Sequence, residues 1–276
     1  MKLFYLPAII LLAVSCTNEI AENTDTGENI LRIGEIDTRS GETSEWVWKT
    51  GDKLTVEVNG STAEYTYTDA GKWTCGDLSF TKEKLGIVAP GSVGLSFGCT
   101  YPDGYGSQTT ESGYRFADYM KGTGSLDGVT VSGELAHMNT DWVINITEGS
   151  GWGGKFESAM SEAVSLVIKR GFGTGLINKL QAYHKGATFR IILPPKYVPK
   201  GTDTFGTLTF GNGSGTPESV KGKSATITYT HNYDANELVG KRLTLTVKLD
   251  ASLNLTITGI TVKDFTGKDV SGELKP

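Results

Sequence analysis

The chain has 276 residues, of which 36 are Gly, and it carries a formal net charge of −5. This acidic balance argues against a nucleic-acid partner, because binding to phosphates needs a basic surface. Glycine-rich turns between short runs of Thr, Val and aromatic residues are typical of all-β proteins. We therefore expect an all-β fold with little helix and no nucleic-acid partner.

Residues 1–15 have the composition of a secretion signal peptide. Lys2 precedes an apolar stretch, Leu3–Val14, that is too short to span a bilayer as a helix. The following Ser15-Cys16 pair and the polar tether 16–29 are similar to a bacterial lipobox and its linker, although Ala13 stands where such patterns usually have Leu. We expect lipidation of Cys16 and anchoring in an outer membrane; the alternative is an ordinary signal peptide that is cut nearby.

The cysteine count is odd, at three. If Cys16 carries lipid, Cys75 and Cys99 remain as a candidate disulfide in an oxidising compartment. The alternative is that both thiols are free and buried, since pairing requires a proximity that spacing alone does not establish.

The clearest local prediction is a hairpin near the start of the mature chain. Leu54–Val58 and Ala63–Tyr67 both alternate apolar and polar residues, and Asn59-Gly60 between them favours a tight turn. A weaker strand is expected over 30–36. Further strands are expected at 78–80, 93–97, 114–119, 129–135 and 142–146.

A dense glycine stretch, 148–154, suggests a domain boundary. We therefore predict an N-terminal β-sandwich domain at 30–150 and a C-terminal one at 151–276. In the second domain a helix is expected over 155–163 and a strand over 164–169. Strands are also expected at 187–193 and 225–230, and a final hairpin at 243–249 and 253–262.

Motifs for catalysis and for metal binding are weak. The three histidines, His137, His184 and His231, are too far apart in sequence for a zinc motif. Ser96 lies in a G-x-S-x-G pattern, but a nucleophile elbow must lead directly into a helix, and the following 99–104 cannot start one. We expect a strand there, no catalytic residue and no cofactor.

Tyrosines around the glycine-rich stretch 104–113 are the best candidates for an exposed aromatic patch that stacks on a sugar. They are Tyr101, Tyr105, Tyr114 and Tyr119. Aromatic residues of β proteins more commonly belong to the core or to cross-strand pairs, and that interpretation stays open here.

Several segments together resemble the fimbrillin-like surface lipoproteins of Gram-negative anaerobes. Thr38-Arg39-Ser40 followed by Trp48-x-x-Gly51-Asp52 is similar to the start of such proteins. Trp142–Ile146 resembles the strand that closes their N-terminal domain, and Phe189–Pro195 resembles part of their C-terminal domain. The resemblance implies two β-sandwich domains of transthyretin-like topology and a role as a non-enzymatic subunit of an adhesive fimbria.

The resemblance also implies a route of assembly. A surface protease would cut between Arg39 and Ser40 and release the strand at 30–36, and a strand from another subunit would fill the opened groove. The donor is expected around 262–276. The alternative is an outer-membrane lipoprotein that does not polymerise and that binds a glycan or a host protein.

Overall fold

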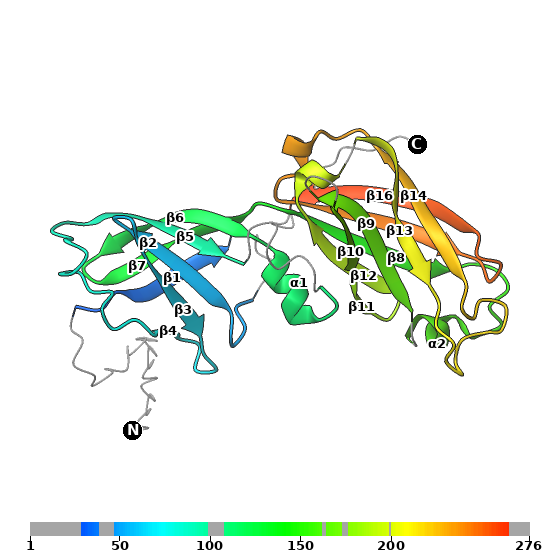
Figure 1. The fold of residues 1–276 in the computed structure, drawn as a ribbon, viewed down its shortest axis with the longest axis horizontal. Helices are drawn as coiled ribbons and strands as arrows, with labels where there is room; N and C mark the ends of the chain where they lie inside the picture. Colours follow the sequence, from blue (N-terminus) through cyan, green and yellow to red (C-terminus); the bar gives the residue numbers. More distant parts are fainter. Residues whose placement is uncertain are drawn as a thin grey trace, which may run out of the picture.

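The computed structural model describes residues 29–38, 47–98, 108–161, 164–172, 176–198 and 200–264. These residues form two lobes, which we call the first half (29–137) and the second half (140–264), with one short helix between them (Figure 1). The predicted all-β class is confirmed. Among the described residues, no helix has the length and apolar character needed to cross a membrane.

The first half is built on one seven-stranded sheet with the order β1-β7-β6-β5-β2-β3-β4. Its strands are β1 (Arg32–Thr38), β2 (Lys53–Val58), β3 (Ser61–Tyr67), β4 (Trp73–Cys75), β5 (Gly91–Phe97), β6 (Met120–Asp127) and β7 (Thr130–His137), and helix α1 (Glu111–Ala117) lies between β5 and β6 in the chain. β1 pairs with β7 in parallel, whereas every other pair in this sheet is antiparallel.

The predicted hairpin is confirmed as β2 and β3. Asn59 and Gly60 both have positive φ, 51° and 78°, as a two-residue turn that matches the twist of the strands requires. Leu54, Val56 and Tyr65 are buried, so the apolar face of the alternating pattern points into the core. Local chemistry is therefore sufficient to form this part of the sheet.

The sheet curls around its own core, and glycines along β6 and β7 lie where the chain leaves no room for side chains. A Cβ atom on Gly122 would lie 1.7 Å from the carbonyl oxygen of Glu134, and one on Gly133 would lie 2.5 Å from the Cα of Gly124. Backbones this close leave no room for a side chain. The two outer strands, β1 and β4, come near each other.

The second half is a two-layer sandwich of a five-stranded sheet, β11-β12-β8-β15-β16, and a four-stranded sheet, β10-β9-β13-β14. The strands are β8 (Thr140–Glu148), β9 (Ser165–Phe172), β10 (Leu176–Gln181), β11 (Tyr183–Lys185), β12 (Thr188–Leu193), β13 (Gly201–Thr209), β14 (Ser224–His231), β15 (Lys241–Leu249) and β16 (Leu255–Asp264), with α2 (Phe156–Ser161), η1 (Pro195–Tyr197) and η2 (Ala235–Leu238) in the connections. Trp142, Phe205 and Tyr229 pack together between the layers.

The resemblance implied that the strand at 142–146 closes the N-terminal domain, but this strand, β8, does not belong to the first sheet. It lies between β12 and β15 in the second half, with Trp142 opposite Ile191 on one side and Leu243 on the other. The predicted boundary at residue 150 would separate β8 from both of its partners. We propose instead that the domain division lies at Met138-Asn139, between β7 and β8.

Two other predictions concern the helical segments between strands: one is confirmed and one is wrong. The helix expected over 155–163 and the strand over 164–169 are confirmed as α2 and β9. The strand expected over 114–119 is wrong, because that segment is largely helix α1. Thr110 begins this helix by accepting a hydrogen bond from the backbone N–H of Gly113, 3.1 Å away, which is a typical N-cap.

Candidate functional site

Strand β1 lies at the edge of the first sheet, where a strand can be exchanged. Its strand partner among the described residues is β7, and its register slips between Ile33 and Ile36 because of a bulge. An edge strand has hydrogen-bonding groups on one side that do not belong to a ladder, so it leaves or joins a sheet more readily than a central strand. We call the surface that β1 covers, formed by the β7 edge together with Tyr65 and Phe80, the β1 seat.

The inner face of β1 completes the core of the first half. Leu31 and Ile36 are buried in the same apolar cluster as Tyr65 and Phe80, and Thr38 is buried at the end of the strand. Backbone bonds fix the beginning of β1: the N–H of Leu31 donates to the carbonyl of Phe80 at 3.1 Å. Loss of β1 would therefore expose both apolar side chains and unpaired backbone groups.

Tyr65 fastens β1 from the opposite side of the core. Its hydroxyl donates to the carbonyl oxygen of Leu31 at 2.8 Å in a buried position. Burial raises the pKa of Tyr65, and the nearby Cys75 raises it further, so the hydroxyl keeps its proton and remains a donor. This bond ties Leu31, the residue just before β1, to β3, near the far edge of the sheet.

Removing that hydroxyl should loosen β1 without disturbing the core. We expect Tyr65→Phe to cost about 1 kcal/mol, the usual net value of one hydrogen bond, and to speed amide exchange over residues 29–38. Hydrogen–deuterium exchange with mass spectrometry measures this directly. Tyr67→Phe on the same strand, whose ring packs against Trp48 and Trp73, is the control; an equal effect of both changes would rule out a specific role for Tyr65.

The outer face of the first sheet is hollowed. A depression with a volume of about 660 Å³ lies over β1, β6 and β7 and is lined by polar side chains, among them Glu35, Asp37, Lys121 and Glu134. Asp37 stands opposite Glu134 in the parallel register. β1 therefore adds two acidic residues, Glu35 and Asp37, to a rim that also holds Glu134 and Lys121.

The predicted processing and modification residues lie mostly outside the described residues. This is true of Cys16, Arg39, Ser40 and Cys99, so the lipidation, the cut and the Cys75–Cys99 pairing stay predictions. Cys75 itself is half-buried at the end of β4 and is a free thiol in the structure. Beyond the proposed cut, Trp48 donates from Nε1 to the carbonyl of Ile36 at 3.4 Å, so the chain folds back across the end of β1.

The other candidate residues lie in ordinary structural positions. Ser96 is the penultimate residue of strand β5, where it pairs with Thr55 of β2. His137 and His231 are buried in different halves, and no cluster of metal-ligating side chains occurs among the described residues.

Tyr114 is not part of an exposed aromatic patch, because its side chain is buried between the two halves. Tyr101 and Tyr105 lie outside the described residues. The hydroxyl of Tyr114 donates to Oδ1 of Asp141 at 2.6 Å, and burial, reinforced by Asp141, raises the pKa of Tyr114. This tyrosine therefore has a structural role in the junction.

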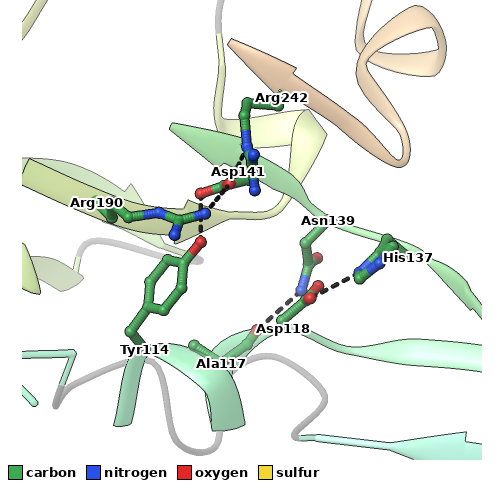
Figure 2. A network of polar contacts seen from close by, with 8 residues as sticks. All are labelled: Tyr114, Ala117, Asp118, His137, Asn139, Asp141, Arg190 and Arg242. Atoms are coloured by element: carbon green, nitrogen blue, oxygen red, sulfur yellow. Dashed lines mark hydrogen bonds and ion pairs between the residues drawn. The ribbon is translucent and has the colours of Figure 1, made fainter. Parts of the chain in front are cut away.

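A polar network that the sequence did not indicate surrounds Asp141 (Figure 2). Oδ2 of Asp141 accepts from Arg190 at 2.9 Å and from Arg242 at 2.6 Å, and its carboxylate is fully buried. Burial alone would raise the pKa of Asp141, but the two guanidinium groups and the Tyr114 hydroxyl lower it overall. These four residues come from α1, β8, β12 and β15, so only the folded chain brings them together.

A second set of bonds fixes the crossing from β7 to β8. His137 Nδ1 and Asp118 Oδ2 are 2.7 Å apart, and Asn139 donates to the carbonyl of Ala117 at 3.0 Å (Figure 2). Gly240 approaches the same crossing, where a Cβ atom would lie 2.9 Å from the carbonyl oxygen of His137. The two halves are thus closely packed at this point.

No protein-family model matches the chain, and no curated protein matches it in sequence. Solved structures are similar in fold. A candidate cell adhesion protein from Bacteroides uniformis has a TM-score of 0.52 at 14% identity, with 87% of this chain and 100% of that chain covered. One from Bacteroides ovatus has a TM-score of 0.53 at 13% identity, with 86% and 98% covered.

A fimbrial assembly protein from Parabacteroides distasonis also matches, at a TM-score of 0.34 and 12% identity, with 85% of this chain and 96% of that chain covered. A score this low does not show a shared fold. The two Bacteroides matches cover both halves of the chain, so the likeness extends over the whole architecture. The chain shares the two-part β fold of candidate cell adhesion proteins from Bacteroides.

Proposed function

We propose that the chain is a cell-surface adhesion protein that assembles with further fimbrial subunits when β1 is replaced by a strand of another subunit. One observation supports this most: β1 lies at the edge of its sheet, yet it completes the core of the first half through only a few buried side chains, such as Ile36. The fold likeness to candidate cell adhesion proteins is consistent with this role. On this proposal the protein is exported, anchored through lipid at Cys16, and later cut between Arg39 and Ser40.

The structure offers a specific donor within the chain. Leu31 and the following strand β1 read L-R-I-G-E-I-D-T up to Thr38, and β16 reads L-T-I-T-G-I-T-V from Leu255 to Val262. Leu and two Ile residues occupy the same three positions in both segments, while Val262 stands where β1 has Thr38. Both strands also have a register shift after the first isoleucine. β16 therefore presents the spacing of side chains that the seat accepts.

β16 would also bring fewer acidic groups to the outer rim than β1 does. In this alignment Gly259 replaces Glu35 and Thr261 replaces Asp37, so no carboxylate would face Glu134. β16 is itself an edge strand, and its inward side chains Leu255, Ile257 and Ile260 are only partly buried. A strand with these properties loses less on leaving its own sheet than a central strand would.

Peptide exchange tests this proposal. A specific protease site is inserted between Thr38 and Trp46 of the full chain, and the cut protein is mixed with labelled peptides of residues 255–264 or 265–276. We expect the first peptide to bind and to displace the β1 fragment, and the same peptide with Ile260→Asp to fail, because a charge cannot enter the apolar seat. Fluorescence anisotropy and native mass spectrometry report both events.

Failure of both peptides to bind, with the cut chain remaining monomeric, would contradict strand exchange. Binding of the 265–276 peptide alone would move the donor into the tail. A mature protein on its native cell that begins at lipid-modified Cys16 and is never cut would instead support the alternative, a non-polymerising lipoprotein that binds a glycan or a host protein.

A further inference from the structure

Helix α1 belongs to the first half by sequence and to the second half by packing. It lies in the chain between β5 and β6, which are neighbours in the first sheet. Yet Tyr114 and Ala117 are part of the apolar core of the second half. The segment from Gln108 to Asp118 is therefore an arm of the first half that is inserted into its neighbour.

Gln108 anchors this arm to the second half in the manner of a short added strand. Its Nε2 donates to the carbonyl of Ile192 at 2.9 Å, and the N–H of Ile192 donates back to its Oε1 at 2.8 Å. β11 pairs with β12 only as far as Arg190, so Gln108 satisfies the backbone that β11 does not reach. Together with the bond from Tyr114 to Asp141, this fixes the arm at two points.

The opposite side of α1 holds the first half. The guanidinium of Arg115 donates to the carbonyl of Val47 at 2.8 Å and to Oδ2 of Asp52 at 2.5 Å, and its side chain is only 8% exposed. The segment that it holds, 47–52, leads directly into β2. The same segment contacts β1, because Trp48 donates to the carbonyl of Ile36.

We propose that α1 is a clasp that keeps the start of β2 in place when β1 leaves its seat. With β1 present, segment 47–52 is held from both sides, by the end of β1 and by Arg115. Once β1 has left, the buried contact from Arg115 remains, together with the backbone bonds of Gly51 and Asp52 to Tyr67 and the packing of Trp48 on Trp73. A cut at Arg39 would also place the segment close to a free chain end, where fraying is easiest. The second half would thus support the first through α1 while the seat is empty. The physiological part of this inference rests on the proposed function, but the physical part does not.

The full chain with β1 prevented from docking provides the test. Leu31→Asp together with Ile36→Asp places two charges at buried positions, which undocks β1 without any cleavage. In this background and in the unaltered one, Arg115→Gln is compared with Lys49→Gln. The latter breaks an exposed ion pair, Lys49–Glu111, between the same two elements. Amide exchange over residues 47–58 is measured by mass spectrometry.

We expect Arg115→Gln to speed exchange of this segment by about tenfold when β1 is undocked and by less than about threefold when it is docked. Lys49→Gln should have little effect in either form, because exposed ion pairs contribute little. Asp52→Asn, which keeps the Val47 contact, should have an intermediate effect and serves if Arg115→Gln does not fold.

The clasp would be refuted by an equal effect of Arg115→Gln in both forms, or by equal effects of Arg115→Gln and Lys49→Gln. It would also be refuted if undocking β1 unfolds segment 47–58 while Arg115 is intact. None of these measurements uses a donor strand. A failure of the peptide-exchange experiment therefore leaves the role of Arg115 unchanged, and a failure of the Arg115 test leaves strand exchange unchanged.

Discussion

Asp141→Asn is expected to lower the free energy of unfolding by about 2–3 kcal/mol, because removing one partner of a buried ion pair leaves the other charges uncompensated. The estimate is below that for a fully buried pair, since Arg190 and Arg242 keep 26% and 19% of their side chains exposed. Chemical denaturation measures the change. As the control, Asp234→Asn removes an exposed carboxylate paired with Lys200 and should change the stability by less than about 0.5 kcal/mol.

The same carboxylate predicts a dependence of stability on pH. The pKa of Asp141 is lower in the folded chain than in the unfolded one, so its contribution is fully present above the unfolded value of about 4. That contribution is lost as the pH falls through the folded pKa. We therefore expect the wild-type chain to lose more stability than Asp141→Asn between about pH 4 and lower values. Parallel losses in the two proteins would contradict this assignment.

Gly122→Ala is expected to destabilise the first half by about 3 kcal/mol or more, at the upper end of overpacking effects. The added Cβ would lie 1.7 Å from the carbonyl oxygen of Glu134, so β6 and β7 would have to separate. Because β7 also pairs with β1, we expect faster amide exchange over residues 29–38 as well. Thermal unfolding and hydrogen exchange provide the two measurements.

Gly94→Ala is a matched control on the neighbouring strand β5. Its Cβ would meet the Cβ of Glu57 at 3.4 Å, which is close to ordinary van der Waals contact. This change should be nearly neutral or slightly stabilising, because alanine reduces the freedom of the unfolded chain. If the two substitutions had equal effects, the curl of the sheet would not depend on Gly122.

The sequence predicts those parts of the fold whose chemistry is local. The β2–β3 hairpin follows from alternation and from Asn59-Gly60, and both signals lie within one stretch of the chain. The α1 helix was missed because Tyr114 and Phe116 alternate with Arg115 and Ala117 like a strand, while its strongest helical signal is the single N-cap Thr110. A short helix packed between two domains has too few turns for a clear period.

The placement of β8 and the Asp141 network could not be predicted in the same way. Asp141 meets Arg190 at a separation of 49 residues and Arg242 at 101 residues. No spacing rule connects residues so far apart, because only the sheet topology brings them together. The exchange of the strand at 30–36 is expected only through a resemblance, because no local pattern in the sequence indicates that Leu31 packs against Tyr65 and Phe80.

The paired strands β8 and β15 lie far apart in the sequence, and this separation also has a consequence for biosynthesis. β8 lies between β12 and β15, and Leu243 of β15, which pairs with Trp142, is synthesised about 100 residues after it. Until then the apolar face of β8, with Trp142, Ile144 and Ile146, has no completed sheet. Contacts so distant in sequence form slowly, and the waiting strand is prone to aggregation. The chain is therefore expected to need a holding chaperone until β15 is available.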